Sequence, residues 1–138
     1  MAVLSGVSKE KGQELFMMFP KSVNIQKFKE YLTKLRQENG DDKICLFMDN
    51  LSTHTSDKSK KAMRELGLRY IWNIAYSPDY NAVESVFSKV KQKFRVLRVQ
   101  KLMGQINDSY ETIIKKSFKS VRKQDVINCV NYSLNLLK

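Results

Sequence analysis

The chain has 138 residues, of which 42% are hydrophobic and 28% charged, a composition typical of one globular domain and not of a disordered segment. No apolar run approaches the roughly 18 residues of a membrane helix, and the first residues lack the basic lead of a secretory signal, so we expect neither a membrane partner nor secretion. The formal net charge of +11 favours a polyanionic partner.

The positive charge is concentrated in the last third of the chain. Residues 1–48 hold 8 basic and 6 acidic side chains, residues 49–84 hold 5 and 5, and residues 85–138 hold 12 and 3, which gives net charges of +2, 0 and +9. This asymmetry favours nucleic-acid phosphates as the partner. A solvated basic helix face without a ligand is the alternative interpretation.

The hydrophobic pattern predicts a series of strands and helices. The expected elements, in chain order, are strands over 2–7 and 13–19 around a turn at Gly12, a helix capped by Asn24, a strand over 43–48, a helix capped by Ser56, a strand over 68–74, a turn over 76–79, a helix opened by Asn81, and helices over 106–121 and 124–137. The continuously apolar run 43–48 is typical of a central strand buried on both faces. This order predicts an α/β fold with a mixed sheet flanked by helices.

Both cysteines, Cys45 and Cys129, stand in apolar surroundings far apart in the sequence. This pattern predicts two buried free thiols in an intracellular, reducing compartment.

Two acidic residues, Asp49 and Glu84, follow predicted strands. Asp49 comes directly after the run 43–48, and Glu84 lies in the first turn of the helix that Asn81 opens. If the strands 43–48 and 68–74 are parallel neighbours, both carboxylates lie at the same rim of the sheet, where Mg²⁺ or Mn²⁺ could bind. The alternatives are a simple turn at Asp49 and a capping box between Asn81 and Glu84.

Two segments carry a family resemblance. Residues 47–54 read Phe-Met-Asp-Asn-Leu-Ser-Thr-His, and residues 75–91 read Ala-Tyr-Ser-Pro-Asp-Tyr-Asn-Ala-Val-Glu-Ser-Val-Phe-Ser-Lys-Val-Lys. Together they resemble mariner-type transposases of the DDE superfamily and their bacterial insertion-sequence relatives. The 34 residues between Asp49 and Glu84 (84 − 49 − 1) match the spacing of one large branch of that family.

The resemblance extends from near Met1 to about Arg95 and implies a ribonuclease-H-like fold. It also implies phosphodiester hydrolysis and strand transfer on DNA, with Mg²⁺ or Mn²⁺ held by three carboxylates. By this resemblance Asp49 is the second catalytic, metal-binding carboxylate and Glu84 the third. The residues implied to lie next to the site are Asn50, His54 and Asn81. The departures from the family pattern are Ala75 and Ala82, in place of prolines, and Phe87, in place of a tryptophan.

The family's first catalytic aspartate lies on a strand before the hairpin, and no aspartate precedes Asp41 here. We therefore expect metal binding by the isolated chain to be weak or absent, and its catalysis to be incomplete. The alternatives are a domesticated, non-catalytic DNA-binding or interaction module, and a nuclease completed by a partner chain. We also expect the gap in the sheet to be filled, either by another polypeptide, as a second chain or a homodimer, or by residues 2–7 pairing directly with 43–48.

The helix after Glu84 is the expected contact with DNA. The residues predicted to bind its backbone are Lys89, Lys91, Lys93, Arg95, Arg98 and Lys101. We expect a partial catalytic domain over 1–100 and a basic helical extension of it over 101–138. No small-molecule substrate is expected, and the expected location is nuclear in a eukaryote and otherwise cytoplasmic.

Overall fold

The computed structural model describes residues 1–74 and 77–138 of the chain. The elements in chain order are β1 (Ala2–Ser8), β2 (Gly12–Phe19), α1 (Ile25–Glu38), β3 (Cys45–Met48), α2 (Ser52–Thr55), α3 (Asp57–Glu65), β4 (Arg69–Trp72), the 3₁₀ helix η1 (Pro78–Tyr80), α4 (Ala82–Leu102), α5 (Tyr110–Lys119) and α6 (Lys123–Leu136). The motif residues Ala75 and Tyr76, and with them the start of the predicted turn, lie outside the described residues.

The strands form two separate pairs. β1 and β2 make an antiparallel hairpin from Ala2↔Phe19 to Ser8↔Gly12, and the turn requires a glycine because Gly12 has φ 76°. β3 and β4 run parallel, from Cys45↔Arg69 to Met48↔Trp72. The described residues thus contain the antiparallel and the parallel pairing expected of a mixed sheet. The two pairs form separate two-stranded sheets that are not joined to each other.

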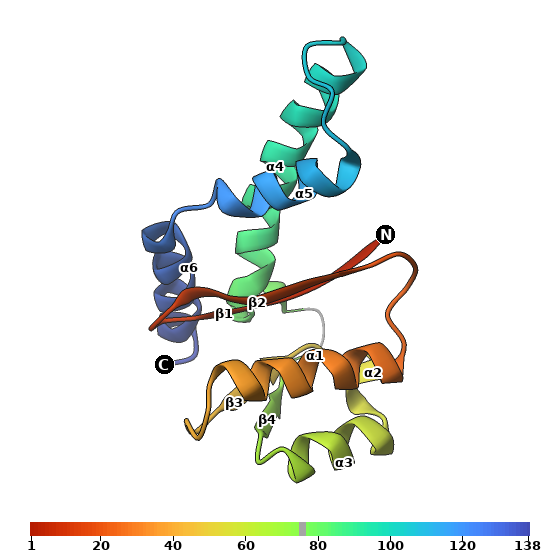
Figure 1. Ribbon diagram of the computed structural model, residues 1–138. Helices are drawn as coiled ribbons and strands as arrows, with labels where there is room; N and C mark the ends of the chain where they lie inside the picture. The colour runs from red at the N-terminus through yellow and green to blue at the C-terminus, as the bar shows by residue number, and fades with distance from the viewer. Residues whose placement is uncertain (75–76) are drawn as a thin grey trace.

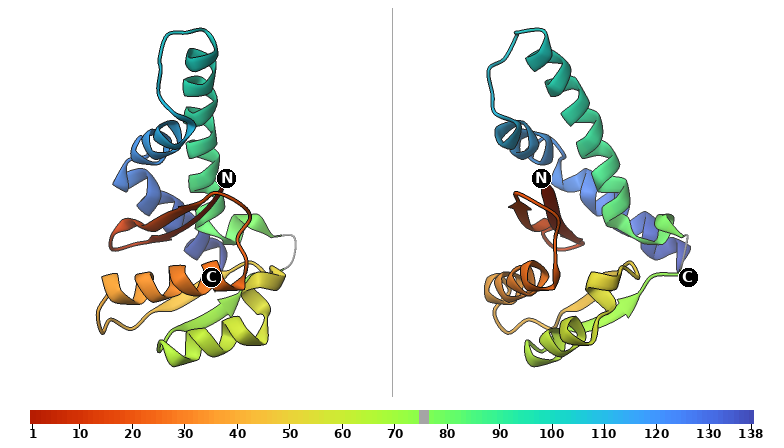
Figure 2. Two further views of the ribbon diagram at one scale, coloured as in Figure 1. Left: turned by 45° about the vertical axis from the view of Figure 1, so that its right-hand side comes forward. Right: turned by 90° about the vertical axis from the view of Figure 1, so that its right-hand side faces the viewer.

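Two hydrophobic clusters hold these pairs in place. The first joins α1 and α3 through Phe28, Leu32 and Met63, with Leu4 of the hairpin and partly buried residues of β3 and β4 packed against it. The second joins α4, α5 and α6 around a set of buried residues, with Val3 of the hairpin packed against it. Because successive side chains of a strand point to opposite faces, β1 contributes to both clusters. The hairpin therefore lies between α1 on one side and α4 and α6 on the other (Figures 1 and 2).

Capping residues decide where the helices begin. The predicted caps Asn24 and Ser56 are confirmed, since their side chains accept hydrogen bonds from the backbone N–H of Lys27 and Ser59. The expected helix over 106–121 starts late, because the Ser109 side chain caps α5 at Tyr110. The short helix α2 was not predicted. Within the described ranges, no helix combines the length and apolar character that crossing a bilayer requires.

The prediction of a central strand buried on both faces is wrong. β3 begins at Cys45 and pairs only with β4, and its residues are exposed or half-buried. The expected second neighbour of this strand is not among the described strands, so one edge of β3 stays open. For the same reason Cys45 is exposed, against expectation, while Cys129 is half-buried against the second cluster; both thiols are free. The alternative pairing of residues 2–7 with 43–48 is also wrong, because among the described strands β1 pairs only with β2.

Candidate active site

Asp49 is held at the carboxyl end of β3 by two asparagine side chains. Its Oδ1 accepts a hydrogen bond from Nδ2 of Asn81 at 3.2 Å and a longer one from Nδ2 of Asn73 at 3.4 Å. Asn81 and Asn73 are both buried, at 7% and 6% exposure. Two buried donors aimed at one oxygen fix the carboxylate in place.

Glu84 meets Asp49 from the first turn of α4. The pKa of Glu84 is raised, first by partial burial, then by the negative charge of Asp49 and by a side-chain hydrogen bond with Asp49; Lys91 acts in the opposite direction. The capping-box alternative is not realised, because the Asn81 side chain makes no cap hydrogen bond and contacts Asp49 instead. The strands 43–48 and 68–74 do run parallel, and they bring the two predicted carboxylates together.

His54 and Asn50 brace the loop that follows Asp49. The imidazole Nδ1 of His54 lies 3.1 Å from the main-chain carbonyl oxygen of Asp49, so Nδ1 carries the proton and donates. The imidazole ring also packs against the ring of Phe28, with ring centroids 4.7 Å apart. Nδ2 of Asn50 donates to the carbonyl of Asn73 at 2.8 Å, which ties the loop to the end of β4. Both residues thus act on the position of Asp49 through the backbone.

Asn73 was not predicted from the sequence. It follows β4 as Asp49 follows β3, and its backbone N–H donates to the Met48 carbonyl at 2.7 Å. Its Nδ2 also donates to the Ser77 carbonyl at 2.8 Å, and its Oδ1 is buried without a hydrogen-bond partner among the described residues. A polar residue directly after an apolar strand was the available signal.

The long helix α4 carries a basic stripe on the face that begins at Glu84. Lys91, Arg95 and Arg98 stand 7, 11 and 14 residues after Glu84, and at about 100° per residue they fall within about 40° of it around the helix. All three are exposed. The stripe therefore runs from the two carboxylates along α4 for about 20 Å, at 1.5 Å per residue.

The other predicted DNA contacts lie elsewhere on α4. Lys89 and Lys93 are rotated by about 140° and 180° from Glu84. The pKa of Asp125 on α6 is lowered, chiefly by a hydrogen bond from Arg122 and to a smaller extent by the charge of Lys89, so Lys89 faces α6. Lys101 is half-buried: its Nζ donates to the Asp108 carbonyl at 2.7 Å and lies 5.6 Å from the centre of the Tyr110 ring. Its contacts fix the loop before α5.

The donor set at this rim consists of hard oxygens, which suit Mg²⁺ or Mn²⁺. After burial, the negative charge of Asp49 is the next cause that raises the pKa of Glu84, and a bound cation would offset this repulsion between the two carboxylates. Asp49 and Glu84 therefore fit a divalent cation. In the described part of the chain, no group of three or more His, Cys, Asp or Glu side chains comes together in a geometry that could hold a metal ion. The site provides two carboxylates.

Solved structures with the same fold include the catalytic domain of Mos1 mariner transposase, at 15% identity and a TM-score of 0.65 over 94% of this chain and 66% of that chain. The catalytic core domain of BIV integrase matches at 17% identity and a TM-score of 0.63 over 88% of this chain and 75% of that one. The chain thus has the ribonuclease-H-like fold of DDE transposase and integrase catalytic domains, as predicted.

The Mos1 matches extend to complexes. The Mos1 paired-end complex with left transposon end matches at 17% identity and a TM-score of 0.68, covering 94% of this chain and 39% of that one. The Mos1 catalytic domain is also solved with Raltegravir and Mn, and with Raltegravir and Mg. This chain spans slightly less than two thirds of the Mos1 catalytic domain. No curated protein sequence matches it.

The sequence profile of the DDE superfamily endonucleases matches residues 1–106. This chain belongs to the DDE superfamily endonuclease family.

Proposed function

We propose that this chain is the part of a DNA-cleaving and strand-transferring domain that supplies two of its metal-binding carboxylates, and that it is catalytically incomplete when isolated. The observation that carries the proposal is the meeting of Asp49 and Glu84 at the carboxyl ends of parallel strands, within the part of the chain that matches the family. Mg²⁺ or Mn²⁺ bound there would polarise a phosphodiester and activate an attacking water or 3′-hydroxyl.

The residues around Asp49 prepare it for this role. Asn81 and Asn73 donate hydrogen bonds to Oδ1 and so orient the Asp49 carboxylate toward the rim that it shares with Glu84. Glu84 approaches from α4, and its raised pKa means that it keeps its proton to a higher pH than an ordinary carboxyl group, so a cation that binds here would displace that proton. Metal binding therefore releases a proton at a pH near the pKa of Glu84.

The basic stripe on α4 supports DNA as the substrate. Lys91, Arg95 and Arg98 continue the face of Glu84 and are exposed. A phosphate backbone lying along this stripe would bring one phosphodiester to the carboxylates at its end. The support from relatives is the Mos1 complex with a transposon end, which has the same fold.

The test is plasmid cleavage by the purified chain in Mg²⁺ or Mn²⁺. We expect no nicking by the wild-type chain, because two carboxylates hold one cation weakly and form only part of a two-ion site. Metal-dependent nicking that disappears in Asp49→Asn would show that the isolated chain is complete and would contradict the proposal. Nicking that survives in Asp49→Asn would indicate a contaminating nuclease, so that preparation would be repurified and assayed again.

The second candidate function is DNA binding without cleavage, whether the chain is isolated or part of a complex. It is favoured by the net charge of +9 over residues 85–138, which does not depend on the carboxylates. In that case Asp49→Asn and Glu84→Gln would leave metal binding unchanged. The first candidate predicts that both substitutions weaken it.

A further inference from the structure

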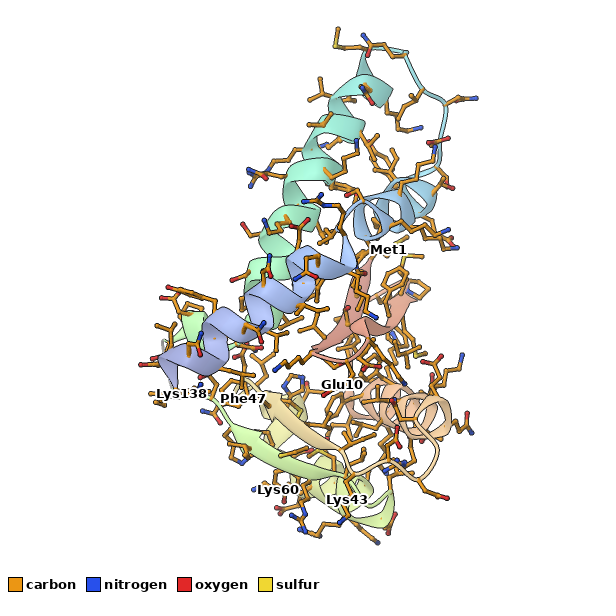
Figure 3. All side chains as sticks on the ribbon, turned by 90° about the vertical axis from the view of Figure 1, so that its left-hand side faces the viewer. Met1, Glu10, Lys43, Phe47, Lys60 and Lys138 are labelled. Carbon is orange, nitrogen blue, oxygen red and sulfur yellow. The ribbon has the colours of Figure 1, made fainter. Side chains whose placement is uncertain are left out.

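The C-terminal half of α4 carries exposed apolar side chains. This half projects beyond the hairpin, with α5 along one side of it, and Figure 3 shows side chains that point away from α5 (Figures 1, 2 and 3). The side chains of Val96, Val99, Leu102 and Met103 are 51%, 53%, 69% and 66% exposed. A single exposed apolar residue is ordinary, but several along one helix are typical of an interaction surface.

Three of these side chains form an apolar stripe, which consists of Val96, Val99 and Met103. Counted from Glu84 at 0° and at about 100° per residue, their positions around α4 are about 120°, 60° and 100°. Val90, which is buried in the second hydrophobic cluster, lies at about 240°. The apolar stripe therefore faces away from that cluster, and it is about 10 Å long at 1.5 Å per residue.

The end of α4 that carries the stripe is held in a fixed conformation. The N–H of Gly104, which has φ 74°, donates to the Lys101 carbonyl at 3.0 Å, and the N–H of Gln105 donates to the Gln100 carbonyl at 2.9 Å. These are the two hydrogen bonds of a Schellman motif. Nζ of Lys101 also ties the following loop to α4 through the Asp108 carbonyl, at 2.7 Å. A partner would thus bind a surface that is already ordered, which lowers the entropy cost of binding.

Basic side chains border the apolar stripe on both sides. Arg95 and Lys93 are exposed and lie at about 20° and 180° around α4, so the stripe runs between them. Residues 85–107 hold six basic and no acidic side chains. A second copy of this surface would bring like charges together, which disfavours self-association. A partner with acidic side chains beside its apolar ones matches the surface instead.

We propose that the apolar stripe binds an amphipathic helix of a partner protein, with Asp or Glu on the borders of its apolar face. Apolar side chains at positions i, i+3 and i+7 of a helix are the pattern that packs against another apolar helix face. DNA phosphates would contact the basic side chains and leave the apolar stripe in water. The proposal concerns a surface apart from the two carboxylates and does not depend on the proposed function.

The test is titration of the purified chain, without DNA, by an end-blocked peptide with a leucine face bordered by glutamates. The probe is Ala-Glu-Leu-Glu-Ala-Leu-Leu-Glu-Ala-Leu-Glu-Ala-Leu-Leu-Glu-Ala. We expect the methyl NMR resonances of Val96, Val99 and Met103 to shift and saturate, while that of the buried Met63 stays unchanged. The same peptide with every Glu replaced by Lys keeps the leucine face and should bind at least tenfold more weakly.

A pair of variants tests the apolar contact. Val96→Gln with Val99→Gln should weaken peptide binding at least tenfold, and α4 should stay folded because glutamine is a good helix former. The matched control is Tyr132→Gln with Leu136→Gln, which removes two exposed apolar side chains from α6. The control should bind the peptide as the wild-type chain does.

Four results would overturn the proposal. The first is no shift of the stripe methyl resonances at millimolar peptide, and the second is equal binding of the lysine peptide. The third is a dimer, seen by sedimentation, that Val96→Gln with Val99→Gln dissociates, which would make a second copy the occupant. The fourth is a stronger response of these resonances to vesicles of phosphatidylcholine and phosphatidylserine than to the peptide, which would assign the stripe to a membrane surface. None of these results bears on metal binding by Asp49 and Glu84, which is measured separately without peptide.

Discussion

Neutralising the basic stripe should weaken DNA binding more than removing the same charge from another surface of the molecule. The change is Lys91→Gln, Arg95→Gln and Arg98→Gln, which removes three exposed charges from the α4 face that starts at Glu84. Glutamine keeps helix propensity and length, so α4 should stay folded. The expected loss comes from three phosphate contacts.

The salt dependence of binding gives the magnitude. Each phosphate contact on duplex DNA contributes about 0.9 to the slope of log K against log salt, so three contacts contribute about 2.7. Over a fourfold rise, from about 50 to about 200 mM, this slope corresponds to a loss of about 40-fold in affinity. We expect the slope of the variant to be shallower than that of the wild-type chain by about 2.7.

The assay is fluorescence anisotropy with a labelled duplex over a salt series. The matched control is Lys58→Gln, Lys60→Gln and Lys61→Gln, which removes the same charge from α3, at the end of the molecule away from the C-terminal half of α4 (Figures 1 and 3). The control should keep most of the wild-type slope. Equal slopes for the two variants would refute the reasoning, because net charge and not the stripe would then determine binding.

Asp49→Asn should bring the pKa of Glu84 down toward its ordinary value, measured by carboxyl NMR titration, and an unchanged pKa would contradict their contact. Because its pKa is raised, Glu84 binds its proton more tightly in the folded state than in the unfolded state. Glu84 therefore contributes to stability at pH values below its ordinary pKa, and this contribution is lost as the pH rises through its pKa in the folded state. Asp49→Asn should reduce that loss. Asn81→Ala removes a buried donor to Asp49 and should weaken Mn²⁺ binding about tenfold or more in calorimetry, whereas unchanged affinity would rule out a positioning role. Phe118→Ala should lower the free energy of unfolding in urea by about 3–5 kcal/mol, because its ring is buried, whereas the exposed Tyr132→Ala should change it by less than about 0.5 kcal/mol.

The sequence predicted the order of the strands and of the longer helices, because local signals specify them, and it predicted the meeting of the two carboxylates on the condition that their strands are parallel neighbours. Asn24 and Ser56 cap their helices as expected, and the apolar runs before Asp49 and Asn73 form the parallel strands. Local pattern determines caps and periodicity, so these features could be predicted.

The pairing of strands could not be predicted in the same way. The run 43–48 has the composition of a central strand, but burial depends on neighbours that its own residues do not encode, and β3 has one neighbour among the described strands. The exposure of Cys45 follows from the same open edge. Asn73 was missed because the strand was predicted to run over 68–74, which placed Asn73 inside it, whereas β4 ends at Trp72; its role is visible only once Asp49 lies beside it.

Binding of Mn²⁺ to the purified chain, followed by electron paramagnetic resonance, tests whether Asp49 and Glu84 are metal ligands. We expect weak but saturable binding of one ion, weakened at least tenfold by Asp49→Asn and by Glu84→Gln. Asp79→Asn, an exposed carboxylate on η1, is the control and should bind as the wild-type chain does. Binding that is the same in all four proteins, or absent from the wild-type chain at millimolar Mn²⁺, would contradict the assignment of Asp49 and Glu84 as metal ligands.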